Sequence, residues 1–339
     1  RRSTAVAEIG CSCQNSRDPT PGRTHPAERR CPGGEQRGTG RSDAGWRDAT
    51  SVGQRRRCAS AAPVVATVTA PTDTHMHFYD AIYPTAPAVT LFPDDATPEQ
   101  YVHVQQSLGL ERVVVVQPTT YGLDNRCQLA GMAEFGDNAR GVMVVSAATE
   151  RSTLAELTEL GVRGARFHML PGGAVGWDQM EPVAHAIAEF GWHMQLQCNG
   201  RDLVDRFDQL VDLPTSLVID HVGRFMPPVP LDHPAYQALR RLVETGTTWV
   251  KLSAPYESSQ EPITNDPDSG ENHGDVLPLI DDVVQAYSDR LLWASNWPHP
   301  GQDPAPTEST LQAQLLRWLP TAALREQVLS TNPNQIYFS

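Results

Sequence analysis

From about residue 64 onward, short β-branched runs alternate regularly with longer segments of helical period. Such alternation is typical of βα units, because each strand needs a crossover before the next parallel strand. We expect eight strands, at residues 71–77, 112–117, 141–146, 162–168, 192–198, 216–221, 247–253 and 290–296. Eight such units in about 275 residues predict an α/β fold of the (β/α)8 TIM-barrel type.

The segments between the predicted strands have the spacing of amphipathic helices, and a closing helical region is expected over residues 311–329. The competing fold, a doubly wound sheet, would place a glycine-rich phosphate-binding turn after an early strand. The stretches Gly172-Gly173 and Gly38-Thr39-Gly40 lack that context. The barrel is therefore favoured.

Residues 1–62 differ from the rest of the chain. They are rich in Arg, Gly and Pro, and they contain four of the six cysteines, Cys11, Cys13, Cys31 and Cys58. A basic binding arm and a small zinc or disulfide module are possible interpretations. The cysteine spacings fit no zinc pattern, and this composition cannot bury a core. We expect a disordered extension, or a start site placed too far upstream, followed by one barrel domain over residues 63–339.

The chain as a whole is acidic, with a formal net charge of -13 over 339 residues. This balance argues against nucleic acid and anionic membrane as partners, and favours a small-molecule substrate. No apolar run has the length of a membrane span, and no signal-peptide pattern is found. Cys127 and Cys198 are too few for a disulfide framework. We expect a cytoplasmic protein.

Candidate catalytic residues stand at predicted strand ends, where barrels of this kind build their sites. His75 and His77 are two residues apart on the first strand and project from one face. His221 ends the sixth strand and Asn296 ends the eighth, which can face the first only if the barrel closes. His168, at the end of the fourth strand, is a further candidate acid, base or electrophile.

Several other polar residues are candidate substrate contacts. Gln117 is expected to face inward with Val115, and Tyr121 and Asn125 could donate hydrogen bonds to a substrate oxygen. An ordinary turn with an Asx cap explains the last two equally well.

Two cations are predicted inside the barrel. An inward Arg166 is costly to bury unless it meets an anion, so we expect a carboxylate clamp, with an internal salt bridge as the alternative. Lys251 is the only lysine of the chain and lies on the seventh strand. Its use there indicates a place where arginine will not serve, so Lys251 is a candidate substrate contact, with a structural pair with a carboxylate as the alternative. Asp220 is expected to point outward.

A metal site is possible but not favoured. A hydrolytic zinc site needs at least three ligands, and His75, His77 and His221 could supply them. The fifth strand presents Gln195 and Gln197 and the eighth presents Asn296, all poor zinc ligands. We predict no metal cofactor, with zinc or manganese as the alternative. The polar segment over residues 258–274 is interpreted as a lid over the site.

The strand ends together resemble the amidohydrolase-related (amidohydrolase 2) family, in its lactonase branch, over roughly residues 68–339. The resemblance rests on Asp73-Thr74-His75-Met76-His77, Gln117-Pro118-Thr119-Thr120-Tyr121-Gly122-Leu123-Asp124-Asn125, Gly164-Ala165-Arg166-Phe167, Ile219-Asp220-His221-Val222-Gly223-Arg224, Trp249-Val250-Lys251-Leu252-Ser253 and Trp293-Ala294-Ser295-Asn296-Trp297-Pro298-His299. It implies a distorted TIM barrel that acts on lactones or related carboxylates, without a required metal.

The resemblance also implies residue roles. His75, His77 and His221 would polarise the lactone carbonyl, and Arg166 and Arg224 would hold a substrate carboxylate with help from Tyr121. Pyrone dicarboxylate lactonases have a water-activating aspartate at the position of Asn296, and an amide cannot accept that proton. The stretch Tyr256-Glu257-Ser258-Ser259 is more similar to aldarolactone isomerases, and Tyr256 is a further candidate substrate contact.

We therefore expect an enzyme that hydrolyses or isomerises a carboxylate-bearing lactone, with a sugar-acid lactone favoured. In isomerisation a substrate hydroxyl attacks the carbonyl, His221 or His168 takes its proton, and the histidine pair with Asn296 stabilises the oxyanion. The alternatives are a divalent-metal-dependent hydrolase or decarboxylase of the same superfamily, a 2-pyrone-4,6-dicarboxylate lactonase, and a non-catalytic carboxylate-binding barrel.

Overall fold

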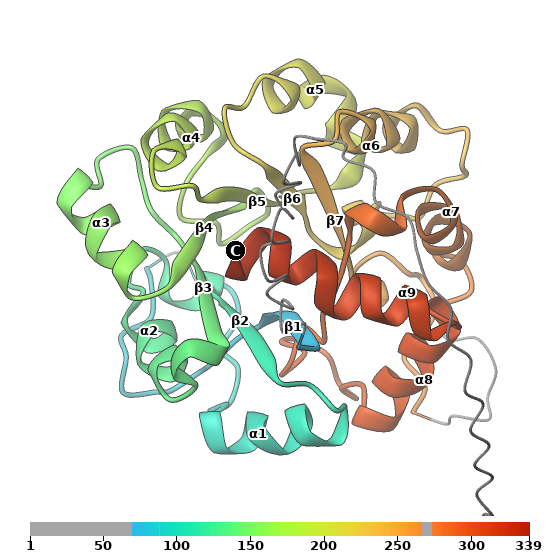
Figure 1. Cartoon of the computed structure of the whole chain (residues 1–339), viewed down its shortest axis with the longest axis horizontal. Coiled ribbons are helices and arrows are strands. Elements are labelled where there is room, and N and C mark those ends of the chain that lie inside the picture. Colours follow the sequence, from blue (N-terminus) through green and yellow to red (C-terminus); the bar gives the residue numbers. More distant parts are fainter. Residues whose placement is uncertain (1–69, 88, 266–272) are drawn as a thin grey trace, which may run out of the picture. The chain divides into compact units, whose positions relative to one another are not determined.

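The computed structural model describes residues 70–87, 89–265 and 273–339. Within them eight parallel strands pair in sequence order from β1 to β8, with helices outside them (Figure 1). The strands are β1 (Thr72–Met76), β2 (Arg112–Val116), β3 (Ala139–Met143), β4 (Val162–His168), β5 (His193–Gln197), β6 (Leu217–Ile219), β7 (Thr248–Leu252) and β8 (Leu291–Trp293). This is the predicted (β/α)8 barrel. The extension expected over residues 1–62 lies outside the described residues.

The helices follow the strands as the barrel architecture requires. They are α1 (Pro98–Ser107), α2 (Arg126–Ala133), α3 (Arg151–Glu159), α4 (Met180–Ala188), α5 (Leu203–Val211), α6 (Pro234–Glu244), α7 (Leu277–Tyr287), α8 (Glu308–Trp318) and α9 (Ala322–Glu326). Local sequence fixes their starts: α1 begins at a capping box between Thr97 and Gln100, with Pro98 at its first position. Among the described residues, no helix combines the length and apolar character needed to cross a membrane.

Backbone hydrogen bonds close the barrel between its first and last strands. The Asn296 N–H donates to the His75 carbonyl at 2.9 Å, and the His77 N–H donates to the Trp297 carbonyl at 2.9 Å. These bonds join the histidine strand to the segment that follows β8. The closure therefore brings Asn296 beside the two histidines, as the sequence predicted.

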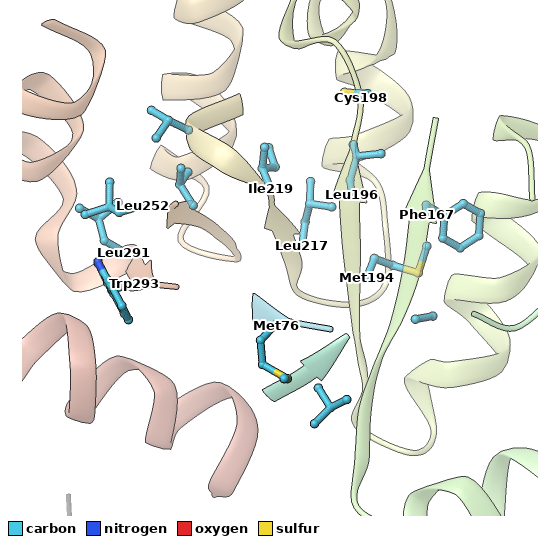
Figure 2. Packing of buried hydrophobic residues seen from close by; sticks show 14 of the residues in the cluster. Met76, Phe167, Met194, Leu196, Cys198, Leu217, Ile219, Leu252, Leu291 and Trp293 are labelled. Atoms are coloured by element: carbon cyan, nitrogen blue, oxygen red, sulfur yellow. The ribbon is translucent and has the colours of Figure 1, made fainter. Parts of the chain in front are cut away.

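The core has two parts. The larger cluster lies between the strands and the surrounding helices, and Figure 2 shows part of it, including Phe167, Leu196 and Leu252. The smaller cluster fills the barrel interior and consists of Val114, Val116, Val142, Val218, Trp249 and Leu292, with Tyr337 from the C-terminal segment. On β2 the alternate residues Val114 and Val116 thus face the interior, and the same alternation sets the direction of the polar residues near the ends of strands.

The C-terminal segment covers the end of the barrel at which the strands begin. It continues from α9 through the helical turns Gln327–Thr331 and Asn334–Phe338, which cross the barrel in Figure 1. The Tyr337 ring meets the His193 ring at 5.1 Å between centroids. Arg112 and Arg140 stack on the Phe338 ring at 4.5 and 4.6 Å. The opposite end, where the strands finish, is left for the site.

The described parts of the predicted lid are anchored. The Gln260 N–H donates to the Asp275 carboxylate at 2.8 Å, and the Gly274 N–H donates to Glu261 at 2.7 Å. The Asn265 amide donates to the Ala305 carbonyl at 2.8 Å. Residues 266–272 of that segment lie outside the described residues.

Candidate active site

A cavity of about 210 Å³ opens at the ends of the strands. Its lining combines imidazoles, guanidinium groups, amides and one carboxylate with a few apolar residues at the rim. The polar lining residues are His77, Tyr79, Thr119, Arg166, His168, Gln197, His221, Arg224, Glu257 and Asn296. Six of them were predicted from the sequence as site residues: His77, Arg166, His168, His221, Arg224 and Asn296.

The histidine pair of β1 has a defined hydrogen-bonding pattern. His77 Nδ1 lies 2.7 Å from the Val116 carbonyl and must donate to it, which leaves a lone pair on His77 Nε2. His75 Nε2 lies 3.2 Å from that atom and therefore carries the hydrogen. His75 Nδ1 is then an acceptor, and it faces Lys251 Nζ at 3.3 Å and the Gln195 amide nitrogen at 3.4 Å. In this tautomer neither histidine has an N–H left for a ligand in the cavity.

The imidazoles of the site are neutral at ordinary pH. Burial, helped by the charge of Arg166, lowers the pKa of His77 to about 3, and the same two causes lower the pKa of His168 to about 3. Burial also lowers the pKa of His75 and of His221 well below the usual value. A neutral imidazole has the lone pair that a general base needs, but a pKa of about 3 makes it a weak base in the empty cavity, and an anionic ligand nearby would raise that pKa.

Beneath the cavity lies a fully buried polar layer around Lys251. Lys251 Nζ donates to the Thr74 carbonyl at 2.8 Å and to Gln195 Oε1 at 2.7 Å, and it lies 3.6 Å from Asp220 Oδ1. Burial lowers the pKa of Lys251 to about 8, against the opposing charge of Asp220. The lysine is thus a structural cation paired with a carboxylate beneath the cavity, and not a group that lines it.

Asp220 corrects a prediction. It was expected to point outward, but its carboxylate lies inside the barrel, 3.3 Å from His75 Nδ1, and accepts from the Gln195 amide at 3.2 Å. β6 ends at Ile219, and Val218 faces the interior, so Asp220 is in phase with Val218.

His221 reaches the cavity through an unusual backbone. Its φ is 53°, and that of Val222 is also 53°, in the left-handed region that non-glycine residues seldom adopt. Such conformations cost about 1–3 kcal/mol each and are held by surrounding contacts. Here the His221 Nδ1 lies 2.9 Å from Ser253 Oγ, and its ring is 5.1 Å from that of His75. The turn, not strand alternation, aims this imidazole.

Arg166 is buried, with 4 % of its surface exposed, and is held by neutral groups. Its two terminal nitrogens donate to the Gln117 carbonyl and to Gln197 Oε1, both at 2.6 Å, while Nε has no hydrogen-bond partner. No ion pair with Arg166 is found in the described part of the chain, so the internal salt bridge weighed from the sequence is not present there. A buried guanidinium without a carboxylate is suited to an anionic ligand.

Arg224, in contrast, is already paired. Its Nε donates to Glu257 Oε2 at 2.8 Å, and both side chains line the cavity. Arg224 has a left-handed φ of 47°, and Glu257 closes the short helical turn Pro255–Glu257 after β7.

Asn296 is fixed from behind by a tyrosine. Its amide nitrogen donates to Tyr256 Oη at 2.9 Å, and Tyr256 Oη lies 3.0 Å from His299 Nδ1. One amide hydrogen and the amide oxygen of Asn296 remain for the cavity. Tyr256, predicted as a substrate contact, thus touches Asn296 and stands behind the lining.

Three predicted substrate contacts are held by backbone groups. Gln117 donates to the carbonyls of Gly122 and Asp124, and the Asn125 amide exchanges two bonds with the backbone of Val144. Tyr121 Oη accepts from the Asp80 N–H and donates to the Asp80 carbonyl. The inward direction expected for Gln117 is wrong because Val114 and Val116, not Val115, face the barrel interior.

The candidate metal ligands do not fit a divalent ion well. Ligand atoms of His75, Asp220 and His221 lie within 4.8 Å of one another, a set that replaces His77 of the predicted trio with Asp220. The Lys251 ammonium is 3.3 Å and 3.6 Å from the nearest atoms of His75 and Asp220. A dication bound to those atoms would lie close to a buried ammonium, where repulsion is strong.

The geometry agrees with comparisons to known proteins. The amidohydrolase family model matches residues 72–338. The chain belongs to this family. It is 31 % identical over 287 residues to D-galactarolactone isomerase of Agrobacterium fabrum, covering 83 % of this chain and 96 % of the relative. It is 32 % identical over 275 residues to 2-pyrone-4,6-dicarboxylate hydrolase of Comamonas testosteroni, covering 78 % and 89 %.

Solved structures of the family show the same fold. An apo crystal structure from Agrobacterium tumefaciens superimposes with a TM-score of 0.73 at 32 % identity, covering 82 % of this chain and 99 % of that one. The resemblance inferred from the strand ends is therefore confirmed.

Four polar lining residues were not predicted as site residues from the sequence: Tyr79, Thr119, Gln197 and Glu257. Glu257 was noticed only as part of a tetrapeptide, and Gln197 only as a poor metal ligand. The signal for Gln197 was available, because it is in phase with Gln195 on β5. No local pattern reveals the pairing of Glu257 with Arg224, which lies 33 residues earlier.

Proposed function

We propose that this protein isomerises a carboxylate-bearing lactone, most simply a sugar-acid lactone, without a metal ion. The observation that carries the proposal is the cavity chemistry around Asn296. Among the described lining residues, Glu257 is the one carboxylate, and it is paired with Arg224. A hydrolase of this kind would be expected to activate water with a free carboxylate. This site offers neutral imidazoles and an amide instead.

The proposed reaction needs no external water. A hydroxyl of the substrate attacks its own lactone carbonyl, the ring oxygen leaves, and the hydroxyl proton is transferred to that oxygen. His168 suits the base role because its Nδ1 faces the acceptor Gln197 Oε1 at 3.2 Å, so its Nε2 carries a lone pair. His221 is the second candidate, since its Nε2 is not used by Ser253.

Substrate binding and oxyanion stabilisation are assigned to other groups. Arg166, a guanidinium that lines the cavity and has only neutral hydrogen-bond partners, binds the substrate carboxylate. The free amide hydrogen of Asn296 supports the oxyanion, in place of the histidine pair, whose N–H groups are already used within the protein. Relatives named as a lactone isomerase and as lactone hydrolases support the choice of substrate class.

A panel assay tests the proposal. Aldarolactones, aldonolactones and pyrone dicarboxylates are incubated with the protein, with and without a chelator, and products are followed by NMR. We expect an aldarolactone to be converted to an isomeric lactone at a rate that chelation does not change. Absence of turnover with every lactone would contradict the proposal.

The cluster of His75, Asp220 and His221 favours one other candidate, a zinc- or manganese-dependent hydrolase or decarboxylase. Elemental analysis of the purified protein separates the two. Near-stoichiometric metal, together with loss of activity on its removal and recovery on its return, would replace metal-independent isomerisation with this function.

A further inference from the structure

The charges that line the cavity do not balance. Two guanidinium groups, Arg166 and Arg224, face one carboxylate, Glu257, so these three side chains leave one positive charge in excess. In the layer beneath, Lys251 and Asp220 offset one another. The lining therefore carries one positive charge in excess, which matches a ligand with one carboxylate.

The excess charge has a defined position. Glu257 neutralises Arg224 through the 2.8 Å bond to its Nε, whereas Arg166 has only neutral partners. A ligand carboxylate is therefore attracted to the Arg166 side of the cavity. A second carboxylate directed toward Arg224 would meet Glu257 in a pocket where water screens charge poorly.

Glu257 also has an unused acceptor. Its Oε2 is bound to Arg224, no described residue donates to its Oε1, and the side chain is 18 % exposed at the cavity. A carboxylate oxygen of this kind accepts hydrogen bonds from hydroxyl groups. It is suited to a hydroxylated part of a ligand and unsuited to another anion.

From these contacts we propose that Glu257 is the specificity-determining residue that selects hydroxylated monocarboxylates over dicarboxylates. The inference deepens the proposed function, on which it rests, by naming the substrate class: a lactone with one free carboxylate at Arg166 and a hydroxyl at Glu257. Dicarboxylates of similar size are rejected by repulsion and by the absence of a second free cation among the described lining residues.

Binding of unreactive acids tests the inference apart from catalysis. Gluconate and glucarate differ in that glucarate has a carboxylate where gluconate has a hydroxymethyl group. Calorimetric titration of the whole protein at pH 7.5 should show gluconate binding at least tenfold more tightly. Equal or tighter binding of glucarate by the unaltered protein would overturn the inference, without need of any variant.

The variant Glu257→Gln removes the charge and keeps the shape. We expect the preference for gluconate over glucarate to fall at least tenfold. The matched control is Glu189→Gln, because Glu189 also pairs with an arginine, Arg151, but on the outer surface. An unchanged preference in a folded Glu257→Gln protein, or an equal fall in the control, contradicts the assignment.

A third ligand tests whether Glu257 accepts a hydrogen bond from a hydroxyl group. Hexanoate carries one carboxylate but no hydroxyl groups, so the unaltered protein should bind it at least tenfold more weakly than gluconate, and Glu257→Gln should narrow that gap. Equal binding of hexanoate and gluconate would show that Glu257 does not bind a hydroxyl group of the ligand. If the binding preferences hold while no lactone is turned over, the proposed function fails and the specificity assignment stands.

Discussion

The Asn296 amide donates a hydrogen bond of 2.9 Å to the hydroxyl of Tyr256, a residue 40 positions earlier in the chain. That hydroxyl lies 3.0 Å from His299 Nδ1, so a chain of three polar groups sets the direction of the amide. Asn296 itself has a left-handed φ of 60°. Its position in the cavity is therefore determined by the loops after β7 and β8 together.

Removing this hydroxyl should impair catalysis more than folding. In Tyr256→Phe the Asn296 amide loses its acceptor, and we expect kcat to fall about tenfold while the free energy of unfolding falls by about 1 kcal/mol. Steady-state kinetics and urea denaturation measure the two effects. Tyr287→Phe, which removes a hydroxyl bonded to Glu244 outside the barrel, should leave kcat unchanged. A normal kcat in Tyr256→Phe would show that Asn296 needs no such support.

Arg166→Lys should weaken substrate binding, because an ammonium cannot span the Gln117 carbonyl and Gln197 and still present an edge to a carboxylate. We expect KM to rise at least tenfold with a smaller change in kcat. Arg163→Lys, on the same strand but bonded to the carbonyls of Thr158 and Val162, is the control. An unchanged KM in Arg166→Lys would show that Arg166 does not bind the substrate carboxylate.

His221→Ala should lose activity by about 10²–10³ if this imidazole stabilises charge or transfers the proton. The comparison with His168→Ala tells which histidine is the base: its loss should cause the larger fall in kcat, and kcat/KM should fall by the same factor because a base acts only in the transition state. His185→Ala, on the exposed face of α4, serves as the control. Near-normal turnover in His221→Ala would exclude it from the mechanism.

The buried histidines predict how stability depends on pH. Burial, with the charge of Lys251, lowers the pKa of His193 to about 3. The folded value lies below the unfolded value near 6.5, so between about pH 6.5 and 3 the unfolded chain binds a proton that the folded chain does not. Stability is therefore lost as pH falls below about 6.5.

Each such histidine contributes up to about 1.4 kcal/mol per pH unit in that window. Urea denaturation at pH 7, 6 and 5 should show a smaller slope for His193→Gln than for the unaltered protein. The exposed His103 on α1 gives the control, since His103→Gln should keep the original slope. An unchanged slope in His193→Gln would mean that this ring is protonated in the folded state.

Much of the fold was predictable because the spacing of apolar residues along the sequence follows which side chains are buried. All eight strands overlap their predicted ranges, and helices lie between them where amphipathic spacing was expected. The ends of strands were less predictable. Alternation from the inward Val218 places Asp220 inside the barrel, and the left-handed turn at His221 then brings the next side chain to the cavity as well.

Site residues at the ends of strands were predictable from the sequence, and site residues in loops were less so. His77, Arg166 and Asn296 line the cavity because barrel closure places them there. Tyr121 and Asn125 resemble ligand contacts in sequence, but their polar atoms satisfy nearby backbone groups. Pairings such as Arg224 with Glu257 join different loops, and a single sequence carries no record of them.

The isotope content of the product tests the central claim most directly. An aldarolactone turned over in H2¹⁸O should give an isomeric lactone without ¹⁸O, because the attacking oxygen comes from the substrate. The variant Asn296→Asp supplies a carboxylate that can activate water, and it should yield an opened acid that contains one ¹⁸O. One ¹⁸O in the product of the unaltered protein, above the enzyme-free background, would show that water is the nucleophile and would contradict the account.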